Sequence, residues 1–325
     1  MCPRVVLAAD VAFVEDFRSV GRRLSNWGRW GSSDQSGTLN FLTSQCVAAA
    51  GQLIRTGRTF RLGGSLSADP AGAHGRVRFD PIHLLSADPG ETVRSDGAAF
   101  ADDLVIMPLQ SGAHWDGLAH CWYDGLMYNG IPASAITPDG CATELGLDRL
   151  INPVVGRGVL LDVAALRGVE QLPLGTVIGP DDLDCALARQ NVEVRSGDII
   201  LVRTGSNITN RRRRQKAVGR DPGRRLWPEP GLSQMCCEWL HERQVAALAS
   251  DNYAVEVLPP EDRGAILPVH CILIRDMGML IGERFDLSTL AADCARDGVW
   301  EFFFAAQPLN LPNSLGSPLN PLAIK

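Results

Sequence analysis

Short apolar runs bounded by turn-forming residues recur along the chain and predict β-strands. These runs are rich in Val, Ile and Leu, the residues that favour strands when turn signals flank them. The predicted strands span residues 104–109, 158–163, 198–204, 245–251 and 269–275. The first of these is apolar throughout, which predicts a buried strand.

Longer segments between these runs place apolar residues at helical spacing. The predicted helices span residues 41–58, 180–191, 231–243 and 286–298. Pro180 starts the second of them, with Asp181 and Asp182 placed to favour the positive end of the helix dipole. Because strands and helices alternate irregularly, the pattern predicts a mixed α/β fold rather than a strict Rossmann alternation.

Composition is that of a soluble enzyme. The chain has 325 residues, of which 45% are hydrophobic, enough for a sizeable core. A net charge of −6 argues against nucleic acid as a partner. Nine cysteines without a C-x-x-C pair favour a reducing compartment over a disulfide framework. No apolar stretch reaches membrane-spanning length or forms a signal-peptide core, so we expect a cytoplasmic protein with no membrane partner.

The most informative stretch follows the first predicted strand and reads Gln-Ser-Gly-Ala-His-Trp-Asp-Gly-Leu-Ala-His. The chain has six histidines, and two of them, His114 and His120, lie here around Asp116. Gly112 and Gly117 disfavour a helix, since each costs about 1 kcal/mol in a helix interior. In an extended segment residues two apart share a face, so His114 and Asp116 can point at one ion.

A second histidine–carboxylate pair, His270 and Glu283, lies near the C-terminus beside apolar sequence. Scarce imidazoles grouped with carboxylates at two distant places are what a metal site built from several elements requires. An ion held by this pair together with His114 and Asp116 would lower the pKa of water and polarise a carbonyl, which predicts hydrolysis. His120 is the candidate to move a proton or orient the water. The alternative is that these are core or turn residues.

These residues resemble the signature of a known family, the cyclase or kynurenine formamidase-like metal-dependent hydrolases, in its longer bacterial members. The family signature reads His-x-Gly-Thr-His-x-Asp-x-Pro-x-His, and residues 110–120 follow it with three substitutions. The resemblance also covers residues 26–31, 37–40, 122–125, 128–130, 267–270, 281–283 and 316–321. It therefore extends over nearly the whole chain.

The resemblance implies a fold and a domain organisation. The fold is α/β, with a mixed, β-barrel-like sheet core flanked by helices, of the swivelling β/β/α type. The implied domain is single and spans 1–325, with an N-terminal extension at about 1–60 and an Arg-rich insertion at about 207–230. The resemblance also implies that the second signature histidine, the signature aspartate and the distant His270 and Glu283 bind metal, and that the last signature histidine is the acid–base group.

Two of the three substitutions affect the chemistry. Gln110 replaces the first signature histidine, a metal ligand in formamidases, and offers a carbonyl oxygen that is a weaker and harder donor. Ala113 removes a hydroxyl, whereas Leu118 in place of proline alters the local turn. The ligand set predicts Zn²⁺ or Mn²⁺, with Gln110 as a doubtful ligand. One ion, two ions bridged by Asp116, and no metal remain open.

Aromatic side chains near the signature segments are candidates for a substrate-binding wall. Trp27, Trp30, Trp115 and Tyr128 would suit a flat small molecule, and Gln110 could hydrogen-bond it. Core packing is the alternative for these aromatic residues. We also expect a homodimer or homotetramer.

Two other features have simpler interpretations. The basic run at 211–216 is expected to be a solvated loop, with a lid or insertion that meets an anionic substrate or a neighbouring subunit as the alternative. Cys121 follows His120 and could be taken for a nucleophile, but free cysteines usually pack as small buried hydrophobes.

Three function classes follow. The first is a metal-dependent hydrolase of an amide, formamide, lactam or lactone. The second is a cyclase or dehydratase of natural-product (polyketide or alkaloid) assembly, with little or no metal dependence, which the substitutions at Gln110 and Ala113 favour. The third, a non-catalytic binding protein, is disfavoured because the other ligand positions are intact.

Overall fold

The computed structural model describes most of the chain. The described residues are 6–8, 14–66, 79–86, 94–138, 142–150, 152–206, 228–262 and 264–325. The basic run at 211–216 and nearly all of the predicted insertion at 207–230 lie outside them.

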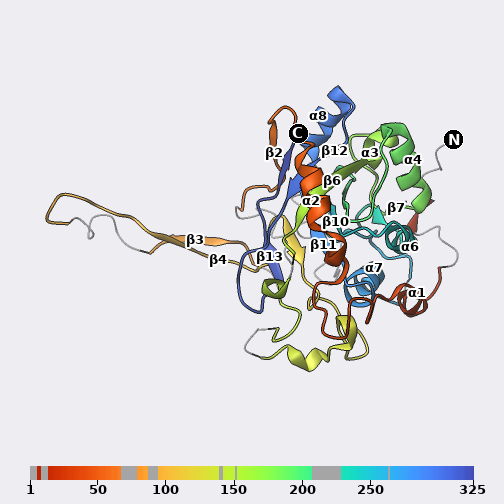
Figure 1. The fold of residues 1–325 in the computed structure, drawn as a ribbon, viewed down its shortest axis with the longest axis horizontal. Coiled ribbons are helices and arrows are strands. Elements are labelled where there is room, and N and C mark those ends of the chain that lie inside the picture. Colours follow the sequence, from red (N-terminus) through yellow and green to blue (C-terminus); the bar gives the residue numbers. More distant parts are fainter. Residues whose placement is uncertain are drawn as a thin grey trace, which may run out of the picture.

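A nine-stranded mixed sheet forms the centre of the molecule and curls into a half-barrel (Figure 1). From one edge to the other its strands are β13 (Gly316–Pro318), β5 (His114–Asp116), β11 (Leu280–Glu283), β10 (Ala247–Ser250), β8 (Ile199–Arg203), β6 (Val155–Asp162), β12 (Glu301–Ala305), β14 (Leu322–Ile324) and β2 (Thr59–Arg61). Helices flank this sheet, so the predicted mixed α/β fold with a barrel-like core is confirmed.

The four strands β11, β10, β8 and β6 run parallel to one another. Their side chains alternate between two hydrophobic cores, with Leu160 and Leu201 in one and Leu161 and Val202 in the other. A parallel sheet is covered on both faces, which is why its strands read as continuous apolar runs. The strands predicted at 158–163, 198–204 and 245–251 are confirmed, with small shifts at their ends.

Helices cover both faces of the sheet. Buried side chains of α1 (Phe17–Leu24), α4 (Pro180–Gln190) and α6 (Cys236–Glu242) join one core, and those of α8 (Ser288–Asp297) join the other. The remaining helical segments are α2 (Ser44–Gly51), α3 (Val163–Leu166), η2 (Gly37–Phe41), η3 (Tyr128–Gly130), η4 (Ala133–Ala135) and η5 (Leu147–Arg149). Predicted helices are thus present but shorter than expected. No helix among the described residues has the length and apolar character needed to cross a membrane.

Two smaller sheets lie outside the central one. One pairs β7 (Thr176–Ile178) with β1 (Val6–Leu7) and β9 (Gly231–Leu232). The other is a ribbon of β3 (Ile82–Leu85) and β4 (Asp103–Ile106) that extends away from the body (Figure 1). All four residues of β4 are exposed, so the prediction of a buried strand at 104–109 was wrong.

The prediction of a strand at 269–275 was also wrong, because this apolar run is helical. It forms α7 (Pro268–His270), which continues as the π-helix η6 (Cys271–Asp276). A short, fully buried apolar run fits either structure by periodicity. What decides it here is the carboxylate of Glu256, which accepts hydrogen bonds from the backbone N–H groups of Val269 (3.2 Å) and His270 (3.0 Å). A carboxylate at this position caps the helix start and complements its dipole.

Glu256→Gln tests this cap. The amide group of glutamine replaces one acceptor oxygen, which leaves a buried N–H unpaired, so the free energy of unfolding should fall by about 1–3 kcal/mol. Urea denaturation followed by circular dichroism measures the change. The control is Glu242→Gln, because Glu242 is exposed and forms a 3.8 Å ion pair with Arg243, and exposed pairs contribute about 0–1 kcal/mol. Equal stability of the two variants would rule out the cap.

Candidate metal centre

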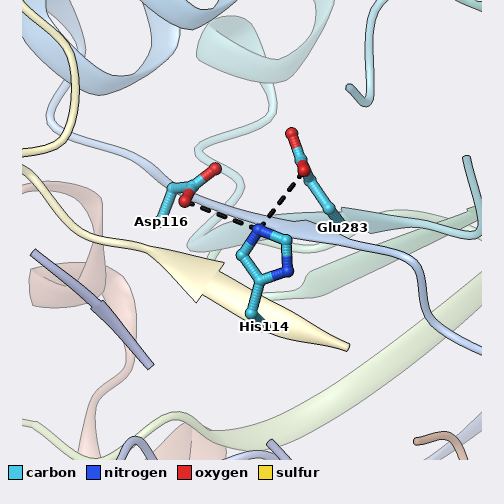
Figure 2. Close-up of side chains that lie close together, drawn as sticks. All are labelled: His114, Asp116 and Glu283. Atoms are coloured by element: carbon cyan, nitrogen blue, oxygen red, sulfur yellow. Dashed lines mark ion pairs between the residues drawn. The ribbon is translucent and has the colours of Figure 1, made fainter. Parts of the chain in front are cut away.

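Strand pairing brings three of the predicted site residues together. β5 lies between β11 and β13, and in its antiparallel register with β11 Glu283 lies directly opposite His114. Opposed residues of paired strands, and residues two apart on one strand, project to the same face of a sheet. His114, Asp116 and Glu283 therefore converge on one point, as Figure 2 shows.

The convergence is tight and buried. The Nε2 atom of His114 lies 3.2 Å from Oε2 of Glu283 and 3.6 Å from Oδ1 of Asp116. One ligand atom from each residue lies within 4.8 Å of the other two. The side chains of His114 and Asp116 are fully buried, and that of Glu283 is 3% exposed. Nitrogen and oxygen donors at this spacing suit a divalent ion such as Zn²⁺ or Mn²⁺.

Several atoms of this cluster are buried without a hydrogen-bond partner in the described part of the chain. They are Nε2 of His114 and both carboxylate oxygens of Asp116. Such atoms are rare in folded proteins, since each unpaired group costs about 1–3 kcal/mol. Because a cation would satisfy all three at once, the donor set fits a metal ion.

The orientation of the His114 ring supports the same interpretation. Its Nδ1 atom lies 3.0 Å from the carbonyl oxygen of Gly112. A carbonyl can only accept, so this contact places the ring hydrogen on Nδ1 and, in the neutral ring, turns the Nε2 lone pair toward the carboxylates. A backbone carbonyl that holds one ring nitrogen is the usual arrangement of a metal-binding histidine.

The electrostatics of the site favour positive charge. Burial alone would lower the pKa of His114, but the carboxylates of Asp116 and Glu283 outweigh it and raise that pKa. Burial would likewise raise the pKa of Glu283, yet contact with His114 and His270 lowers it well below its ordinary range. The pocket therefore holds an ionised carboxylate beside groups that bind a proton or, in its place, a cation.

His120 lies in the turn after β5, at the edge of the cluster. Its Nε2 atom lies 3.5 Å from Oδ1 of Asp116, and its side chain is 25% exposed. Its backbone N–H donates to the carbonyl of Gly117, which closes the turn. His120 thus connects a buried carboxylate with solvent, the position that a proton-transfer group requires.

His270 contacts the site through Glu283. Its Nε2 atom lies 3.3 Å from Oε1 of Glu283, and its Nδ1 atom lies 2.7 Å from Oε1 of Glu256. His270 is not in the compact three-residue group, so direct metal ligation by His270 stays a prediction. Both carboxylates raise its pKa well above the ordinary value, against the opposing effect of burial.

Glu256 is the site residue that sequence reasoning missed. It is 1% exposed, and its carboxylate contacts both the backbone N–H and the ring Nδ1 of His270. A signal was present, because Glu256 stands between Val255 and Val257, and glutamate is almost never fully buried unless it is paired.

Gln110 lies on the other side of β5 from β11. Its carboxamide packs against the backbone of Gly316, where an added Cβ atom would overlap it. Gly316 is the register partner of Asp116 on β13. Gln110 is therefore adjacent to the site, and its roles in metal or substrate binding stay predictions.

The aromatic residues do not form one wall. Trp115 points to the face of β5 opposite His114, where it packs on Phe285 and donates from Nε1 to the carbonyl of Ala306. Tyr128 is fully buried and donates to Asp34. For these two residues the structure agrees with the alternative, core packing.

The two remaining candidates for substrate contact, Trp27 and Trp30, are partly buried. Trp27 donates from Nε1 to the carbonyl of Arg275, and Trp30 packs edge-on against Phe41. Substrate contact by Trp27 and Trp30 stays a prediction.

Comparison with known proteins identifies the family of the chain. The family model described as "Putative cyclase" matches residues 53–257. A crystal structure described as that of a novel cyclase is 39% identical to the chain, covers 93% of it and 99% of its own chain, and has a TM-score of 0.81. No curated protein matches at a significant level.

More distant structures share the fold. Isatin hydrolase A from Labrenzia aggregata, bound to benzyl benzoate, is 19% identical over 88% of this chain and 98% of its own, with a TM-score of 0.57. Isatin hydrolase A from Ralstonia solanacearum is 20% identical over 87% and 98%, with the same TM-score. The family model spans more than half of the chain and includes His114, Asp116 and His120. The chain belongs to the cyclase family.

Proposed function

We propose that this chain is a metal-dependent hydrolase that cleaves a C–N or C–O bond in a small cyclic or acylated molecule. The observation that carries the proposal is the buried convergence of His114, Asp116 and Glu283, with unpaired atoms on the first two. The hydrolase names of the distant structural neighbours support the same reaction class.

His114, Asp116 and Glu283 would hold the ion, most simply a single Zn²⁺ or Mn²⁺. When bound there, a divalent ion polarises a carbonyl oxygen and lowers the pKa of a water molecule. Three protein ligands leave room for substrate or water, as in catalytic rather than structural sites. A second ion would require further ligands, for which His120 and Gln110 are the adjacent candidates.

The surrounding residues orient these ligands and move protons. Glu256 fixes the His270 ring, and His270 in turn holds one oxygen of Glu283, so that the other oxygen faces His114. His120 can take a proton from the attacking water and deliver it to the leaving group, because its ring lies beside Asp116 and reaches solvent. A cytoplasmic location and a homodimer or homotetramer stay predictions.

A cyclase or dehydratase is the second candidate. Gln110 beside β13 can both donate to and accept from a substrate, whereas a histidine ligand would be committed to the metal. Ala113 is 1% exposed, so the missing hydroxyl also changes the interior of the site. Both features favour a pocket rebuilt for a substrate other than a formamide.

The metal is tested first. Protein purified without added metal should contain about one equivalent of Zn²⁺ or Mn²⁺, and His114→Ala should abolish it, because the ligand is lost. Elemental analysis measures the content. His83→Ala is the matched control, since His83 is exposed on the ribbon and pairs with Asp103. If no ion is found and added metal changes neither stability nor activity, the metal-dependent hydrolase is ruled out.

His120→Ala separates proton transfer from metal binding. Turnover of an amide, lactam or lactone found by screening should fall by about 10²–10⁴-fold, while metal content stays nearly unchanged. Asp116→Ala should lose both, because its carboxylate belongs to the ligand cluster. Loss of metal from His120→Ala would instead make His120 a ligand.

Gln110→His decides between the two enzyme classes. In a hydrolase the added imidazole should tighten metal binding and maintain or raise hydrolysis. In a cyclase the loss of the carboxamide should leave a polar group of the substrate mispaired, at a cost of about 1–3 kcal/mol. Mass spectrometry of the product distinguishes addition of water from its loss. Tighter metal binding combined with loss of the native reaction would favour the cyclase.

A further inference from the structure

Two cysteines meet beside the candidate metal centre. Cys121 follows His120 in the chain, and Cys271 follows His270. Their Sγ atoms lie 3.8 Å apart, although the residues are 150 positions apart in sequence. The contact therefore joins the turn after β5 to the start of η6, the two segments that carry the outer histidines of the site.

The environment of this pair differs from that of the buried Cys236 and Cys294. Cys121 and Cys271 are both partly buried, at the edge of a hydrophobic core. The sulfur of Cys236 instead donates to the carbonyl of Ile178, and that of Cys294 accepts from the ammonium of Lys325. Cys121 and Cys271 thus combine access from the surface with a facing thiol.

We propose that Cys121 and Cys271 form a reversible disulfide when the protein meets a hydroperoxide, and that this bond lowers the activity of the adjacent site. A disulfide needs an S–S distance of about 2.05 Å, so the two sulfurs must approach by about 1.8 Å. Side-chain rotation and small shifts of the two segments can supply this movement, because the sulfurs already touch.

The chemistry balances with one equivalent of hydroperoxide. One thiol sulfur attacks the peroxide, so that an S–O bond forms, the O–O bond breaks and water (or an alcohol) leaves, which gives a sulfenic acid. The second thiol attacks that sulfur, so that the S–S bond forms, the S–O bond breaks and a second water leaves. Two electrons pass from the sulfurs to the peroxide, and a dithiol reductant reverses the reaction by thiol–disulfide exchange.

The effect on the site follows from the position of the two neighbours. Whatever part of this approach side-chain rotation does not supply must come from the backbone next to His120 and His270, whose rings lie 3.5 Å from Asp116 and 3.3 Å from Glu283. A displacement of about 1 Å in a catalytic site can cost on the order of 10²-fold in rate. This second part of the proposal rests on the proposed function, whereas formation of the disulfide does not.

The test treats the purified full-length protein with hydrogen peroxide and maps its peptides without reduction. A cross-linked peptide that contains Cys121 and Cys271 should appear, and dithiothreitol should remove it. In parallel, turnover should fall by on the order of 10²-fold and return on reduction. Cys121→Ser, Cys121→Ala and Cys271→Ser should remain active in peroxide, whereas Cys185→Ser, a change at a partly buried cysteine of α4, should respond as the unmodified chain does.

Three results would overturn the proposal. Absence of the cross-linked peptide rules out the modification site itself. Equal inactivation of Cys121→Ser and the unmodified chain assigns the loss to oxidation elsewhere. A complete disulfide with unchanged turnover rules out control of the site. If the chain proves not to be a hydrolase, the peptide map still decides the first part.

Discussion

The site depends on the pairing register between β5 and β11. This register places Glu283 opposite His114, and the two-residue period of a strand then turns Asp116 to the same face. The same register sets Trp115 over Gly282, where any added Cβ atom would lie 2.6 Å from the indole ring. A slip by one residue would turn the ligands into the opposite core and expose the indole to the polar side. The same register thus fixes the packing of Trp115 on Gly282 at one face of the sheet and the ligand cluster at the other.

Burial determines what this cluster can hold. Burying two carboxylates and an imidazole together costs free energy unless positive charge accompanies them. The carboxylates of Asp116 and Glu283 raise the pKa of His114, and contact with His114 and His270 lowers the pKa of Glu283, so the cluster favours positive charge, either as a proton on the ring or as a bound cation. Glu256 extends the arrangement outward, since it fixes the His270 ring that holds Glu283. Glu256 therefore positions His270, His270 positions Glu283, and Glu283 contributes to the ligand cluster.

Local patterns predicted much of this, and the errors have physical causes. Alternation identified His114 and Asp116 as residues of one face, and scarcity of histidine singled out the distant partner segment. The structure adds Glu256, whose position between two valines hints at burial but whose role does not follow from spacing, because it caps a helix in a run that fits a strand equally well. The error at β4 is of a different kind. Its apolar residues were predicted to be buried, yet they lie on a ribbon away from the core. Periodicity reports local structure, whereas burial depends on what the chain packs against.

The division between strands and turns also shows where chemistry can vary in this fold. His114, Asp116 and Glu283 belong to paired strands, so their positions are fixed by backbone hydrogen bonds across three strands. Gln110 and His120 lie just before and just after β5, outside the regular pairing. His120 contacts Asp116 and Gln110 packs against Gly316 beside the site, both from segments that can change without disturbing the register. A substitution such as glutamine for histidine at position 110 can therefore alter the bound group or the substrate while the buried cluster stays in place. The difference between hydrolysis and cyclisation is then expected to reside in these flanking turns rather than in the three residues at the centre.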